Sequence, residues 1–179
     1  MRLSGTIVAL ACTTIAACTA EVPQPSPAPP IARPAPTPTP SATMSPGTTS
    51  WMDAPATSGD WYYRSGGGTT RALFGEPGTD ARFAVTCDPA QRSITLARAG
   101  SGSGPVSMRI LTEFGERTIN AAPSTNTIPS IDARVGSTDS ILDAMAFSKG
   151  RFAVIVAGSD PLYLPSWPEV TRVIEDCRR

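Results

Sequence analysis

Hydrophobic and polar residues alternate in short runs from about residue 56 to the end of the chain. The clearest run, residues 81–87, has apolar side chains at every second position and ends with Cys87. A period of two is typical of a strand that buries one face. A turn sequence, Asp88-Pro89, follows it, and the next alternating run at 92–98 therefore predicts a β-hairpin.

Similar runs recur along the rest of this region, separated by Gly, Pro, Asp and Ser. Many short strands with regular turns favour a mainly β fold of α+β character. We expect an antiparallel β-sandwich or small barrel of about 6–8 strands with two short helices, the second one C-terminal. The further candidate strands are 60–64, 69–74, 106–110, 117–121, 128–135, 151–157 and 162–164.

The first predicted helix begins near residue 139. Thr138 or Asp139 can cap its N-terminus, and Lys149 with Gly150 suits its end. The apolar stripe that should face the core consists of Ile141, Leu142, Met145 and Ala146.

The second predicted helix closes the chain. Ser166 and Glu169 have the spacing of a capping box, and Pro168 suits the first turn. Apolar residues then follow at the helical spacing i, i+3, i+4 and i+7, so the last of them should also be buried. These residues are Val170, Val173, Ile174 and Cys177.

Residues 1–17 have the pattern of a signal peptide, with Arg2 before a short, mostly apolar run. That run is too short to span a bilayer comfortably. It ends in Ile15-Ala16-Ala17-Cys18, which resembles the lipobox of bacterial lipoproteins. The resemblance implies cleavage before Cys18 and acylation of that residue.

Two alternatives for the processing site remain open: lipidation of Cys12, or ordinary cleavage near Ala20. Several acyl chains on Cys18 would hold the protein on a membrane surface without a transmembrane helix. In the lipoproteins that this lipobox resembles, an aspartate after the cysteine retains the protein at the inner membrane; Thr19 stands at that position, so the resemblance favours the outer membrane. The expected location is therefore the periplasm-facing cell envelope.

A proline-rich segment separates the predicted signal peptide from the alternating region. It contains ten prolines between positions 23 and 46, mostly separated by Ala, Ser and Thr. Such a composition cannot bury enough apolar surface to fold, and it favours polyproline II. The expected organisation is a signal peptide at 1–17, a disordered tether at 18–55 and a globular domain at 56–179.

The charge balance and the missing histidines exclude several kinds of chemistry. The chain has 15 basic and 15 acidic residues and no histidine. No cluster of basic residues suggests nucleic-acid binding. Without histidine, neither histidine-dependent catalysis nor metal ligation by histidine can occur. No nucleophile elbow or phosphate-binding loop is present either. We therefore expect no cofactor, no metal ion and no catalytic residues.

The cysteine count predicts one disulfide. If Cys12 leaves with the signal peptide and Cys18 carries lipid, Cys87 and Cys177 remain as a pair in an oxidising compartment. A bridge between them would close a loop of about 90 residues, for which the chain-entropy model gives roughly 4–5 kcal/mol. Two buried free thiols are the alternative.

Aromatic residues are the best candidates for a recognition surface, because aromatic residues and arginines are enriched in binding hot spots. The alternative is that Trp61 and Trp167 pack in or beside the core. Arg64, Arg71 and Arg151 suit an anionic ligand or are ordinary surface charges. The aromatic candidates are Trp51, Trp61, Tyr62 and Trp167.

Several segments resemble domains of uncharacterised proteobacterial lipoproteins. A cysteine-bearing strand with its partner on a late helix is also similar, in architecture alone, to small secreted β-sandwich proteins of the invasion-associated-locus-B type. Neither resemblance implies an activity. The segments that carry the first one are 72–75, 83–88, 142–152, 164–169 and 176–178.

The tether and the missing catalytic set together predict a membrane-tethered binding or assembly module. Its partner would be another envelope protein or the cell wall. The alternative is a periplasmic hydrolase that works without histidine, or an enzyme inhibitor. A concave pocket of several hundred cubic ångströms that holds converging carboxylates would favour a hydrolase, whereas a convex domain with an exposed aromatic patch would favour binding.

Overall fold

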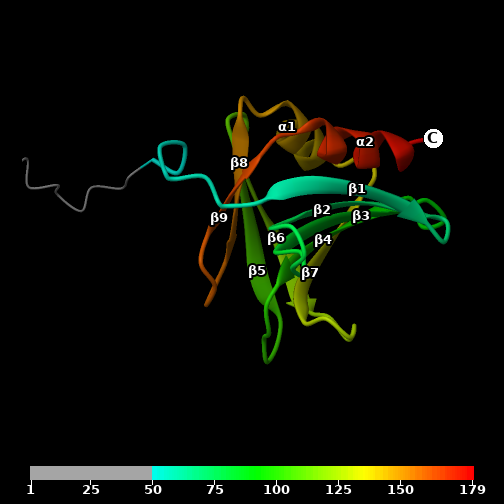
Figure 1. Cartoon of the computed structure of the whole chain (residues 1–179), viewed down its shortest axis with the longest axis horizontal. Helices are drawn as coiled ribbons and strands as arrows, with labels where there is room; N and C mark the ends of the chain where they lie inside the picture. Colours follow the sequence, from blue (N-terminus) through cyan, green and yellow to red (C-terminus); the bar gives the residue numbers. More distant parts are fainter. Residues whose placement is uncertain (1–49) are drawn as a thin grey trace, which may run out of the picture. The chain divides into compact units, whose positions relative to one another are not determined.

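A computed structural model describes residues 50–179 of the chain. They form one antiparallel sheet of nine strands and two helices (Figure 1). The prediction of a mainly β domain with two helices, the second C-terminal, is confirmed. The strands form a single curled sheet, a half-barrel, with one strand more than the upper end of the expected range.

The elements follow one another with short connections. The strands are β1 (Asp60–Gly66), β2 (Thr69–Gly75), β3 (Phe83–Asp88), β4 (Ser93–Ala99), β5 (Val106–Thr112), β6 (Gly115–Pro123), β7 (Ser130–Gly136), β8 (Arg151–Val156) and β9 (Leu162–Pro165). The helices are α1 (Ser140–Phe147), between β7 and β8, and α2 (Pro168–Asp176), after β9.

The strand order is β1-β2-β3-β4-β7-β6-β5-β8-β9. The first four strands form a meander, and the predicted hairpin of β3 and β4 is part of it. β7 then pairs with β4, so the β5–β6 hairpin lies on the far side of β7. This return pairs β4 with β7, two strands that lie more than thirty residues apart in sequence. The alternation within each strand does not specify which strand becomes its neighbour.

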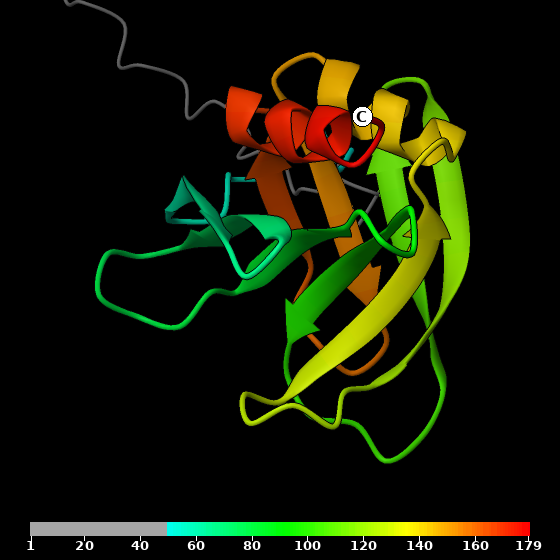
Figure 2. The ribbon, with the colours of Figure 1, turned by 90° about the vertical axis from the view of Figure 1, so that its right-hand side faces the viewer.

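The sheet curls until its two edge strands meet at one end. The indole N–H of Trp61 on β1 donates a hydrogen bond to the carbonyl of Pro165 on β9, at 2.8 Å. The same ring packs edge-on against Phe74 on β2, with centroids 5.3 Å apart, and lies 6.4 Å from the ring of Phe152 on β8. Figure 2 shows the curled sheet with both helices across one end.

The core lies inside the curl and beneath the helices. α2 packs on β1, β2 and β3, and α1 packs on α2, β5 and β6. The predicted alternation is confirmed along β3, where every second side chain is fully buried. The largest fully buried side chains are Phe74, Phe83, Phe152, Ile94, Leu96, Met108, Ile110, Leu142, Met145, Leu162, Leu164 and Ile174.

The sequence predicted the start of α1 correctly but not the start of α2. For α1, the Asp139 carboxylate accepts a hydrogen bond from the amide of Ile141 at 3.0 Å, so Asp139 is the capping residue. For α2, the N-cap is Trp167, and no side chain caps it. The predicted capping box at Ser166 is therefore wrong.

The reason lies in the backbone of Ser166. Its amide donates to the carbonyl of Gly150 at 3.2 Å, so this N–H is not free to donate to the Glu169 carboxylate as a capping box requires. The helix begins after it, with Pro168 in the first turn, where a missing N–H costs nothing. The hydroxyl of Ser166 is buried and has no hydrogen-bond partner within residues 50–179.

The disulfide prediction is confirmed. Cys87 and Cys177 are bonded, with Cα atoms 5.4 Å apart, and each is 1% exposed. The bridge joins β3 to the C-terminal end of α2, where Cys177 is the helix cap.

The described chain before β1 runs beside the edge strand β9. The amide of Thr57 donates to the carbonyl of Tyr163 at 3.0 Å, and the amide of Tyr163 donates to the Thr57 hydroxyl at 2.8 Å. Ala54 is buried, and its carbonyl accepts from Arg151. Ala54, which precedes the expected boundary at 56, thus packs on the domain, and Thr57 satisfies backbone groups of the edge strand β9.

The predicted signal peptide at 1–17, the lipidated Cys18 and the tether up to residue 49 lie outside the described residues. In the part of the chain from Ser50 onward, neither helix has the length and apolar character that crossing a bilayer requires.

Candidate functional site

A broad hollow lies over the outer face of β2, β3, β4 and β7. We call it the sheet hollow; its volume is about 710 Å³. Because side chains alternate along a strand, the residues between the buried ones all point to this face. The hollow is lined by Arg71, Leu73, Ala81, Ala84, Thr86, Thr95, Ala97, Ala99, Asn126, Thr127, Ile128, Pro129, Ser130, Asp132 and Arg134.

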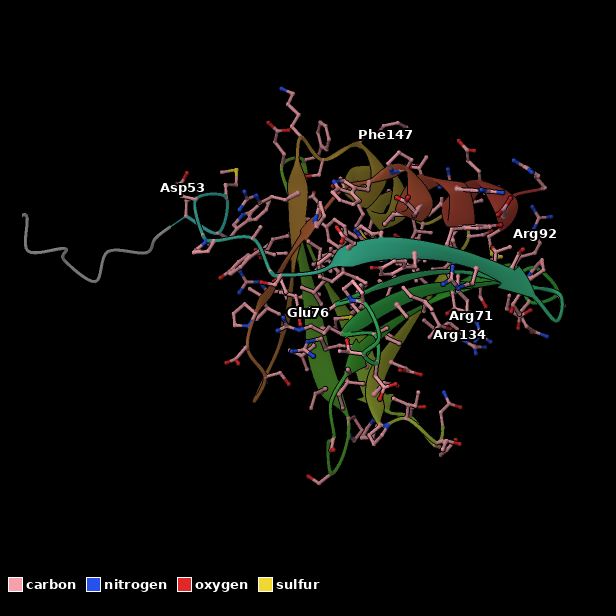
Figure 3. The ribbon with its side chains drawn as sticks, in the orientation of Figure 1. Asp53, Arg71, Glu76, Arg92, Arg134 and Phe147 are labelled. Carbon is pink, nitrogen blue, oxygen red and sulfur yellow. A yellow bond between two sulfur atoms is a disulfide. The ribbon has the colours of Figure 1, made fainter. Side chains whose placement is uncertain are left out.

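One row of paired residues crosses the hollow from strand to strand. Arg71 on β2 pairs with Thr86, Thr86 with Thr95, and Thr95 with Arg134 on β7. Three strand spacings separate the two arginine Cα atoms, which corresponds to about 14 Å. Figure 3 shows both arginine side chains on the side of the sheet away from the helices. Two guanidinium groups therefore flank two adjacent threonine hydroxyls.

The positive charge of this row continues onto β1. Arg64 pairs directly with Arg71, and its guanidinium lies 5.9 Å from the centre of the Tyr62 ring. Within residues 50–179, neither Arg71 nor Arg134 forms an ion pair; the ion pairs there involve other arginines, such as Arg109 with Glu116. The row thus carries three arginines without a paired carboxylate.

The next row along the strands is mostly apolar. Leu73, Ala84 and Ala97 are paired across β2, β3 and β4, and the row ends in Asp132 on β7. The loop before β7 forms a wall of the hollow, and its Ile128 is 54% exposed. The hollow therefore has a basic end and an apolar end.

Asp132 is the one carboxylate among the lining residues. Its Oδ1 accepts a hydrogen bond from the Ser130 hydroxyl at 2.7 Å. A lone carboxylate beside a serine lacks the second acid or base that hydrolysis by general acid–base catalysis requires. Among residues 50–179, no group of three metal-ligating side chains occurs.

Within residues 50–179, Tyr63 and Arg98 have shifted pKa values, and neither residue lines the hollow. Tyr63 donates a hydrogen bond to Asp176 Oδ2 at 2.8 Å, which, together with burial, raises the pKa of Tyr63. Burial lowers the pKa of Arg98, and the nearby charge of Arg82 adds to this effect. Tyr63 joins β1 to α2, so its shift reflects a structural contact.

No protein-family model, curated protein or solved structure matches this chain. The resemblance to proteobacterial lipoproteins therefore stays a prediction.

The four aromatic residues predicted for a recognition surface do not come together. Trp61 is 4% exposed and belongs to the core, so its assignment to a surface is corrected. Its ring is large and apolar, and its N–H finds a carbonyl partner inside the curl. Trp167 is 41% exposed at the start of α2, and Trp51 is half-buried in the turn before β1. Neither lines the sheet hollow.

Tyr62 is the predicted aromatic residue that lies nearest the hollow. With Arg64 it lines a smaller depression of about 260 Å³, which shares Leu73 and Ala81 with the sheet hollow. Its partner across the strand pair is Leu73.

Of the three arginines suggested from the sequence, the structure places two together and separates the third. Arg64 and Arg71 belong to the basic row, whereas Arg151 binds the carbonyl of Ala54. Arg134 was missed. Alternation alone puts it on the outer face of β7, but only the pairing of β7 with β4 brings it to the other arginines.

Proposed function

We propose that this protein is a lipid-anchored binding module of the cell envelope, and that the sheet hollow is its ligand-binding face. Cys18 carries the anchor, the proline-rich segment is the tether, and the domain presents the hollow. The observation that carries the proposal is the row of Arg71, Thr86, Thr95 and Arg134, which offers positive charge and hydroxyl groups to a ligand.

The chemistry of the lining supports binding more than hydrolysis. Arginine recognises carboxylate and phosphate oxygens through paired hydrogen bonds, and here two arginines face the same hollow. The lining offers one carboxylate, Asp132, and no partner that would make it a catalytic pair.

The anchor is supported by the sequence around the proposed cleavage site. Each buried methylene contributes about 0.8 kcal/mol, so two or more acyl chains hold a protein stably at a bilayer. A lipidated Cys18 would therefore keep the hollow within the periplasm, at a distance from the membrane that the tether sets.

Replacement of the cysteine tests the anchor. We expect Cys18→Ser to abolish acylation and to prevent the processed chain from partitioning into the detergent phase. Metabolic labelling with a fatty acid gives the direct measurement, and Cys12→Ser is the matched control, which should remain labelled. Labelling that survives Cys18→Ser but not Cys12→Ser would move the anchor to Cys12.

Site-specific crosslinking tests the binding face. A photoreactive amino acid replaces Ala97 on the floor of the hollow, and Ser107, which is exposed on β5, is the matched control. We expect a reproducible adduct in intact cells from position 97 only, identified by mass spectrometry. Equal adducts at both positions, or none at either, would contradict the assignment of the hollow as the binding face.

A further inference from the structure

The two ends of the sheet hollow differ in chemistry, and this difference restricts what can bind there. At one end, Arg71 and Arg134 stand at either side of Thr86 and Thr95. At the other end, the surface consists largely of apolar side chains, including Leu73, Ala81, Ala84, Ala97 and Ile128.

The basic end holds charge that the domain does not neutralise. Arg64 and Arg71 are direct cross-strand partners, and like charges in this position destabilise a sheet. Within residues 50–179, Arg71 and Arg134 have no ion-pair partner. An anion held above Thr86 and Thr95 would relieve this repulsion and would accept hydrogen bonds from the hydroxyls.

The apolar end has no charged group except Asp132, which already accepts a hydrogen bond from Ser130. This carboxylate would repel a second negative charge on a ligand. An uncharged part of the ligand would instead pack over the alanines and Ile128. The volume of about 710 Å³ lies in the range of sites for single small molecules, which is roughly 300–1,000 Å³.

We infer that the sheet hollow binds an amphiphilic anion, with one phosphate or carboxylate headgroup between Arg71 and Arg134 and an alkyl body over Leu73, Ala97 and Ile128. This inference rests on the proposed function, because it names the ligand class of the same face. It adds that the ligand is a small lipid-like molecule and not a protein surface.

Direct binding to the purified full chain tests the inference. Isothermal titration compares octyl phosphate, octanoate, octanol and inorganic phosphate, each below its micelle-forming concentration. We expect at least one of the two amphiphilic anions to bind, with an affinity about tenfold or more above that of inorganic phosphate, and octanol not to bind. The stronger of the two anions identifies the headgroup.

Paired variants locate the site. Arg71→Gln with Arg134→Gln should weaken binding of the anion by about tenfold or more, because both charge-assisted contacts are lost. Ala97→Glu should also weaken it, by placing a carboxylate on the apolar floor. Arg109→Gln removes an exposed arginine outside the hollow and is the matched control, with unchanged binding expected. Circular dichroism spectra that match the wild-type spectrum show that each variant is folded.

Three results would overturn the inference. These are no binding of either amphiphilic anion, equal binding of octyl phosphate and inorganic phosphate, or unchanged binding in the double arginine variant. If an adduct still forms at position 97 in cells while neither anion binds, the hollow is a binding face for another ligand class. In that case the proposed function stands and the inference fails.

Discussion

At the scale of single residues, Tyr63 shows how one side chain joins distant parts of the domain. Its hydroxyl donates to Asp176, and Arg172 lies 3.9 Å above its ring. The hydrogen bond to Asp176 raises the pKa of Tyr63, with burial adding to it and Arg172 opposing it. The protonated phenol therefore stabilises the contact between β1 and α2.

This contact predicts a loss of stability at alkaline pH. With its pKa raised above 10.0, folded Tyr63 keeps its proton at pH values where the unfolded chain has lost it. The free energy of unfolding should therefore fall as pH rises above about 10. Tyr63→Phe should be less stable than wild type at pH 8, and the difference should shrink as pH rises past 10.

Urea denaturation at pH 8 and at pH 11 measures this difference. Tyr62→Phe lies on the opposite face of the same strand and is the matched control. An equal difference between wild type and Tyr63→Phe at both pH values would contradict the role assigned to the Tyr63–Asp176 hydrogen bond.

At the scale of elements, the two helices begin in different ways. An aspartate caps α1, whereas α2 begins with proline after an extended residue whose amide is already bonded. A capping box marks a helix start only if the amide of its first residue is free to donate to the glutamate. At Ser166, the hydrogen bond from this amide to the Gly150 carbonyl occupies the donor, and the N-cap is Trp167.

Alanine substitutions at the two helix starts should therefore have opposite outcomes. Asp139→Ala should lower the free energy of unfolding by about 0.5–2 kcal/mol, because the amide of Ile141 loses its acceptor. Ser166→Ala should leave stability unchanged or slightly raised, because it removes a buried hydroxyl that has no partner within residues 50–179. Chemical denaturation of both variants provides the measurement, and a loss at Ser166 like that at Asp139 would restore the capping box.

At the scale of the whole molecule, the disulfide and the curl bring the ends of the domain together. Trp61 on the first strand contacts Pro165 at the end of the last strand, and Cys177 is bonded to β3. The stripe of α2 that packs on the sheet consists of three residues, Val170, Val173 and Ile174. Such a short terminal helix gains much of its stability from a covalent attachment.

Removing the disulfide should therefore destabilise the whole domain. The double variant Cys87→Ala with Cys177→Ala should lose about 2–4 kcal/mol and melt on the order of 10 °C lower. Calorimetry measures the melting temperature, and reduced wild-type protein should match the variant. Proteolysis should then begin at α2. Alkylation of both cysteines in the native, oxidised protein would contradict the bridge.

The sequence by itself determined the properties that depend on local spacing. The period of two assigned Phe83, Val85 and Cys87 to the core, and the period of 3.6 placed Cys177 on the buried face of its helix. With Cys12 and Cys18 assigned to the predicted signal peptide and lipid anchor, Cys87 and Cys177 were left as the expected disulfide pair. The two periodic patterns follow from neighbours along the chain, so the order of side chains is enough to specify them.

Only the tertiary structure decided which strands are neighbours. Arg71 and Arg134 are both exposed strand residues, yet they flank one hollow because β7 returns to β4 after the β5–β6 hairpin. Alternation within a strand shows which side chains are buried but carries no information about which strand becomes its partner. For the same reason, the burial of Trp61 and the late start of α2 were set by contacts with residues far away in sequence.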